Sequence, residues 1–137
     1  VAFERLEITV RDGKGFKDRT AMLTRSLVEP LQAHLAQDRA QHKEDVEQGR
    51  GEVYLPYALS RKYPAVGREW GWQYVFPARD VSVDPRSDMV RRHHLDAKAV
   101  QRAMKEAVRA VDLAKPATPH TLRHSFAPYL LQYPYGA

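Results

Sequence analysis

The most informative stretch of this 137-residue chain reads Thr118-Pro119-His120-Thr121-Leu122-Arg123-His124-Ser125-Phe126-Ala127. Thr118 is suited to cap a helix, and Pro119 suits the first helical position because that position has no intrahelical N–H bond to lose. His120 and Arg123 are then three residues apart and share one face near the helix N-terminus. That end of a helix carries partial positive charge and free N–H groups. Together with an imidazole and a guanidinium, it predicts a phosphate-binding site.

A β-hairpin is predicted upstream, over residues 5–24. Residues 6–10 alternate apolar and polar side chains, which is typical of a half-buried strand. Residues 12–15 read Asp-Gly-Lys-Gly, a turn with two glycines able to take positive φ. Residues 20–23 are the expected returning strand. Lys14 then lies at the tip of the hairpin, with Lys17 and Arg19 just behind it.

Most of the remaining chain is expected to be helical. Apolar residues recur at helical spacing over residues 26–48, in the first half of a long helix that Gly49 and Gly51 end. Its polar second half, residues 41–48, is expected to project into solvent. A short helix is expected at 57–63, and residues 80–92 are expected to be irregular around an Asp84-Pro85 turn. A clean amphipathic spacing predicts a further helix with a buried stripe formed by Val100, Ala103, Met104, Ala107, Val108 and Val111.

These elements define the expected fold class as α+β, mostly helical with a small antiparallel hairpin or sheet. The net charge is +5, from 22 Lys and Arg against 17 Asp and Glu, and suits a polyanionic partner. The chain has no cysteine, no 18-residue apolar run and no signal peptide. We therefore expect a cytoplasmic protein with no membrane partner. No cofactor and no metal site are expected, since the adjacent His93 and His94 would point to opposite faces of a strand.

The decapeptide that begins at Thr118 resembles the His-x-x-Arg box of the tyrosine recombinases. Residues 13–19, Gly-Lys-Gly-Phe-Lys-Asp-Arg, resemble the hairpin that carries the catalytic lysine of that family, with Lys14 at the lysine position. The resemblance implies a recombinase catalytic fold acting on DNA. In that chemistry a tyrosine attacks a phosphate, and His120 and Arg123 hold its oxygens. Lys14 protonates the leaving 5′-oxygen, and Lys17 and Arg19 of the same hairpin are expected to bind DNA.

Three further segments resemble integron integrases: residues 58–64, residues 68–77 and the run Arg91-Arg92-His93-His94. In that subfamily the region holds bases that protrude from a folded single-stranded recombination site. By position, the implied base pocket comprises Trp72, Pro85, His93 and His94. Aromatic and imidazole faces stack on unpaired bases, at roughly 1–3 kcal/mol per contact. The alternative is that Trp70 and Trp72 are core residues.

The resemblance runs over roughly residues 3–132, and residues 1–137 are expected to be part of a recombinase catalytic domain. No residue matches the first catalytic arginine of the family, and Tyr129, Tyr133 and Tyr135 lie too close to Arg123 to match its nucleophile. The expected function is integron-type DNA recombination and integration, catalytically incomplete in this chain. The alternatives are a non-catalytic DNA-binding module that competes for recombination sites and a degenerate gene fragment. Expected partners are DNA, as a folded single strand or a duplex, and a second copy or an intact recombinase.

Overall fold

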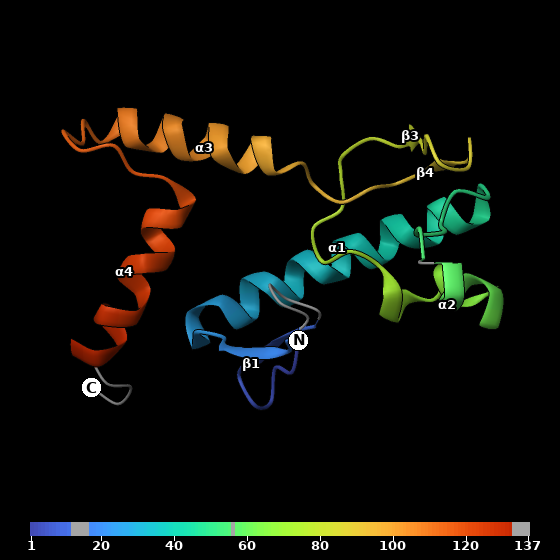
Figure 1. Ribbon diagram of the computed structural model, residues 1–137, viewed down its shortest axis with the longest axis horizontal. Helices are drawn as coiled ribbons and strands as arrows, with labels where there is room; N and C mark the ends of the chain where they lie inside the picture. Colours follow the sequence, from blue (N-terminus) through green and yellow to red (C-terminus); the bar gives the residue numbers. More distant parts are fainter. Residues whose placement is uncertain (12–16, 56, 133–137) are drawn as a thin grey trace. The chain divides into compact units, whose positions relative to one another are not determined.

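The computed structural model describes residues 1–11, 17–55 and 57–132 (Figure 1). The chain forms two compact units, Val1–His93 and His94–Ala137. In the described residues, helices form most of the regular structure, and the strands form two antiparallel pairs in the first unit. The predicted α+β class, mostly helical with a small antiparallel hairpin, is confirmed.

The predicted N-terminal hairpin is present. Strand β1 (Glu7–Val10) pairs with β2 (Arg19–Met22), with Glu7 opposite Met22 and Val10 opposite Arg19. The backbone N–H of Leu23 donates to the carbonyl of Leu6 at 2.7 Å, which extends the pairing to a buried leucine. The turn, residues 12–16, lies outside the described residues, and so does Lys14.

The long helix α1 (Val28–Glu47) follows a 3₁₀ turn, η1 (Arg25–Leu27). As predicted, glycines mark its end. Gly49 takes a φ of 73°, a left-handed conformation that glycine adopts without strain. A Cβ on Gly51 would lie 2.3 Å from the Cγ2 of Val46, so only glycine lets the chain fold back so closely on the last turn of α1.

The second half of α1 is largely exposed, as predicted, but Asp45 within it is buried, and Gln41 and His42 are half-buried. Asp45 is only 2% exposed, and the Nε2 of His42 donates a 2.9 Å hydrogen bond to the carbonyl of Arg68. Asp45 and His42 pack against the rest of the unit through an ion pair and a hydrogen bond, rather than through an apolar stripe. Hydrophobic spacing carries no signal for this kind of packing.

Short elements complete the first unit. They are α2 (Tyr57–Lys62), the 3₁₀ turns η2 (Val66–Arg68) and η3 (Trp70–Trp72), and the strands β3 (Ser82–Val83) and β4 (Val90–Arg91). Residues 80–92 were expected to be irregular, but β3 and β4 form a small antiparallel hairpin. The predicted turn at Asp84 is confirmed: its carbonyl accepts the N–H groups of Ser87 and Asp88, and its side chain accepts that of Arg86.

The second unit contains helices α3 (Ala97–Ala110) and α4 (Pro119–Gln132). Asp96 caps α3 by accepting the N–H of Lys98 at 2.9 Å. The predicted apolar stripe is present, but Met104 and Val108 are half-buried while Val100 and Val111 are exposed. Helix α4 continues through Pro128.

Candidate nucleic-acid interface

The N-terminus of α4 is capped as its sequence predicts. The Thr118 hydroxyl accepts the N–H of Thr121 at 3.3 Å, and the Thr121 hydroxyl accepts the N–H of Thr118 at 3.1 Å. This reciprocal pair fixes the first turn, as in a capping box. Pro119 follows at the first helical position. The helix therefore begins at one defined residue and presents its positive end at His120.

His120 and Arg123 lie on one face of this first turn, and both side chains are exposed. The nearest ring to His120 is that of His124, one turn further along, with the two Nε2 atoms 2.7 Å apart. Among the described residues, no hydrogen bond or ion pair engages the Arg123 guanidinium. The arrangement offers one imidazole, one guanidinium and a helix N-terminus to an anion approaching from solvent.

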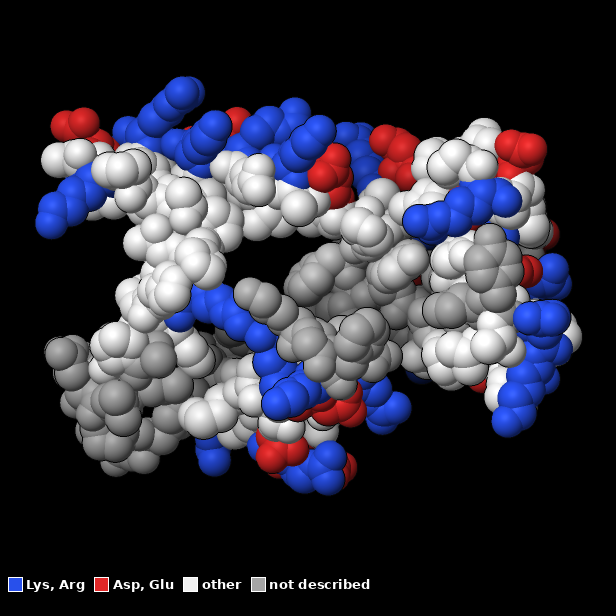
Figure 2. Space-filling view, in the orientation of Figure 1, with Lys and Arg blue, Asp and Glu red and all other residues white. Residues whose placement is uncertain are grey.

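Helix α3 carries a basic stripe that the sequence reasoning missed. Its residues follow one another at spacings of four, three and four: Lys98, Arg102, Lys105 and Arg109. This is the spacing of a single helix face, and all four side chains are exposed. Figure 2 shows Lys and Arg side chains along α3, interspersed with acidic ones. The signal was available in the sequence, because the stripe has the same period as the apolar stripe of this helix.

In the first unit, the two tryptophans have different environments. Trp72 is 44% exposed, so the alternative that both tryptophans are core residues does not hold for Trp72. Trp70 is half-buried, and its ring lies 5.9 Å from the imidazole of His42. The difference arises because η3 is a single 3₁₀ turn, on which side chains two residues apart point to different sides. One tryptophan therefore holds the turn against α1, and the other leaves its ring accessible.

The other residues assigned to DNA by resemblance differ in exposure. Pro85 is exposed in the β3–β4 turn, and His93 is half-buried with its backbone carbonyl accepting the N–H of Ala78. His94 is exposed and belongs to the second unit. Lys17 and Arg19 are exposed on the hairpin. The structure therefore groups Trp72, Pro85 and His93 in one unit and His120 and Arg123 in the other.

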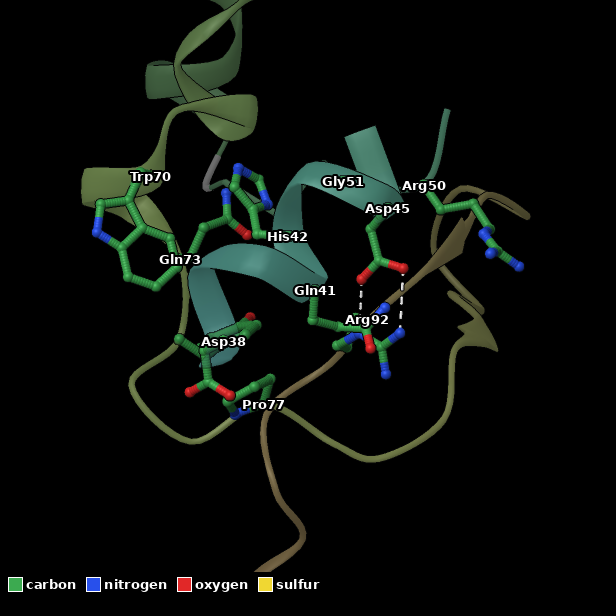
Figure 3. Close-up of a pocket in the computed structure, with 11 residues that line it drawn as sticks. Asp38, Gln41, His42, Asp45, Arg50, Gly51, Trp70, Gln73, Pro77 and Arg92 are labelled. Atoms are coloured by element: carbon green, nitrogen blue, oxygen red, sulfur yellow. Dashed lines mark hydrogen bonds and ion pairs between the residues drawn. The ribbon is translucent and has the colours of Figure 1, made fainter. Parts of the chain in front are cut away.

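Two arginines that precede His93 are structural. Arg91 is buried beside the fully buried Asp84, with Nε and Oδ2 3.5 Å apart. Arg92 donates two hydrogen bonds to the carboxylate of Asp45, from Nε at 2.6 Å and from Nη2 at 3.0 Å (Figure 3). Its Nη1 also donates to the carbonyls of Ala78, at 3.0 Å, and Arg79. Arg92 thus links the end of α1 to residues 78–79, which lie more than 30 residues away in the sequence.

A small pocket beside this ion pair is lined by α1, residues 70–77 and Arg92 (Figure 3). Its volume of about 20 Å³ holds roughly one water molecule, so it is too small for a nucleobase. Burial raises the pKa of the Asp38 carboxyl at its edge, while the positive charges of His34 and Arg92 lower it less. The Nε2 of His34 lies 3.0 Å from Asp38 and 2.8 Å from the carbonyl of Val75.

This direction of shift predicts how Asp38→Asn changes stability with pH. A carboxyl whose pKa is higher in the folded than in the unfolded state contributes its full stability at low pH. That contribution is lost as the pH rises through the folded pKa. The asparagine variant lacks this loss, so its stability relative to the parent should improve between about pH 3.5 and pH 7. Urea unfolding across this range measures it, with the exposed Asp88→Asn as control. A relative stability that falls with pH would show that the attraction of His34 and Arg92 outweighs burial.

Comparison with known proteins identifies the family of the chain. Residues 1–135 match the phage integrase family, and the chain belongs to that family. The chain is 50% identical over 133 residues to proteins named "Integrase/recombinase" from Escherichia coli and from Pseudomonas aeruginosa. The match covers 97% of this chain and 40% of each relative, so the chain spans less than half the length of these curated relatives.

Among the described residues, no helix is long and apolar enough to cross a membrane. No group of three or more His, Cys, Asp or Glu side chains among them is placed to hold a metal ion.

Proposed function

We propose that this chain belongs to a site-specific DNA recombinase and supplies its contacts to the scissile phosphate. His120 and Arg123 bind the non-bridging oxygens, where negative charge develops as the phosphate is attacked. Lys14 protonates the leaving 5′-oxygen. The observation that carries the proposal is the capped, exposed N-terminus of α4, which presents both side chains on one face. We propose that the protein acts in the cytoplasm and that DNA is its partner there.

The proposed recombinase is of the integron integrase type. Trp72, Pro85, His93 and His94 then hold a base that protrudes from a folded single-stranded site, and Lys17 and Arg19 contact the backbone. The exposure of the Trp72 ring and of Pro85 supports this assignment, because stacking requires an accessible face. A second copy or an intact recombinase is the proposed protein partner.

A non-catalytic DNA-binding module is the second candidate. The exposed basic stripe of α3 favours it, since phosphate contacts along a helix need no nucleophile. A degenerate fragment without function predicts no preference for a folded recombination site over other DNA. Comparing the affinity for a folded single-stranded site with that for an unrelated hairpin therefore separates a degenerate fragment from a protein that recognises recombination sites.

DNA binding should depend on salt and on Arg123. We expect a non-specific dissociation constant on the order of 10⁻⁴–10⁻⁶ M that rises steeply with salt. Arg123→Ala should weaken binding to all sequences alike and reduce the slope of log K against log salt by about 0.9, one phosphate contact. Arg5→Ala is the control, an exposed arginine paired with Glu7 in the first unit. An unchanged slope in Arg123→Ala would exclude a phosphate contact at this residue.

We further propose that the 137-residue polypeptide binds DNA without forming a covalent bond to it. A suicide substrate, nicked so that a cleaved strand diffuses away, traps any 3′-phosphotyrosine intermediate. The expected result is no adduct at concentrations where the substrate is bound. An adduct mapped to Tyr129, Tyr133 or Tyr135 would overturn the proposal, because it would identify a nucleophile within this segment.

A further inference from the structure

Two histidines on α4 point their ring nitrogens at one place. His120 and His124 lie four residues apart, so they occupy the same face on successive turns. Their Nε2 atoms are 2.7 Å apart, the ring centroids are 4.2 Å apart, and the ring planes are nearly perpendicular. Both side chains are exposed. A single proton between the two Nε2 atoms accounts for the contact in the absence of any other ligand.

The same arrangement suits a transition-metal ion. Neutral imidazole nitrogen is a preferred ligand of zinc, copper and nickel, and two histidines four apart on a helix converge on one ion. Two Zn–N bonds of about 2.0–2.1 Å at a tetrahedral angle separate their nitrogens by about 3.3 Å. The Nε2 atoms of His120 and His124, now 2.7 Å apart, therefore need to separate by only about 0.6 Å. Exposed side chains can do this by small rotations, and the ion then replaces the proton they share.

We propose that His120 and His124 form a chelating site for a divalent transition-metal ion of the zinc class. Among the described residues no third protein ligand is present, so water or another oxygen ligand fills the remaining positions. The site should bind copper more tightly than zinc. It should not bind magnesium, since imidazole is a poor ligand for hard cations. Binding of the ion does not depend on the proposed recombinase function, because it needs only these two side chains.

Zinc binding to the 137-residue chain, without a histidine tag, tests the site. Isothermal titration with zinc chloride should give one saturable site per chain, and magnesium chloride should give none. His124→Ala should weaken zinc binding at least about tenfold, because one imidazole remains and the chelate is lost. His120→Ala should have the same effect.

A spacing control separates chelation from the mere number of histidines. The double variant His124→Ala with Ser125→His keeps six histidines but moves the second ring from four to five residues after His120, off the shared face. It should bind zinc as weakly as His124→Ala, and circular dichroism checks that each variant is folded. Binding by the double variant as tight as that of the parent would overturn the site, as would a parent chain with no saturable zinc binding. Metal-free binding to duplex DNA, measured alongside, reports on the proposed function separately.

Discussion

Arg92→Ala should lower the free energy of unfolding by about 3–5 kcal/mol, because it breaks a buried ion pair. The substitution leaves the Asp45 carboxylate, which is 2% exposed, without its two guanidinium hydrogen bonds. It also removes the donor to the carbonyls of Ala78 and Arg79. The hydrogen bond with Asp45 raises the pKa of Arg92, so the guanidinium remains charged at every pH at which the protein is handled.

Urea unfolding of the whole chain measures this loss. Arg68→Ala is the matched control, because Arg68 also pairs with a carboxylate, Glu52, but its side chain is 61% exposed. An exposed pair contributes at most about 1 kcal/mol, so this variant should unfold close to the parent. Equal losses in Arg92→Ala and Arg68→Ala would show that the Asp45 ion pair does not hold the first unit together.

Trp72→Ala should weaken binding to a DNA hairpin with extrahelical bases roughly 5- to 150-fold, which corresponds to a stacking contact of roughly 1–3 kcal/mol. Binding to plain duplex and the melting temperature should change little, because the Trp72 side chain is 44% exposed and supports little of the fold. Fluorescence anisotropy with matched hairpins, with and without the extrahelical bases, gives the two affinities. Thermal unfolding gives the melting temperature.

Trp70→Ala provides the contrast within the same 3₁₀ turn. Trp70 is half-buried and its ring contacts His42, so its removal should lower the melting temperature. It should not discriminate between the two hairpins. If Trp72→Ala instead lowers the melting temperature as much as Trp70→Ala and weakens both hairpins alike, Trp72 has no role in holding a base.

Features that depend on neighbours in sequence were predictable. The alternation in residues 6–10 predicted the first strand, and helical spacing predicted α1 and α3. The Thr118 cap placed the start of α4 at the correct residue. The contact between His120 and His124 was also predictable in principle, because side chains four apart on a helix are neighbours. The basic stripe of α3 follows from the same rule.

Features that depend on distant residues were not predictable. Nothing in the polar run 41–48 indicates that Asp45 within it is buried, since its partner Arg92 lies 47 residues further along the chain. Only the folded chain brings that arginine to the carboxylate and so buries one acidic side chain in an otherwise largely exposed stretch of the helix. The exposure of Trp72 was also not predictable, because the residue type alone does not say whether a tryptophan packs inward, as Trp70 does, or faces solvent. The sequence by itself determined the elements, the helix cap and the placing of His120 and Arg123 on one face, because these follow from local backbone and spacing rules. The tertiary structure alone decided which polar groups are buried and which aromatic ring is accessible, because both depend on contacts between segments far apart in the chain.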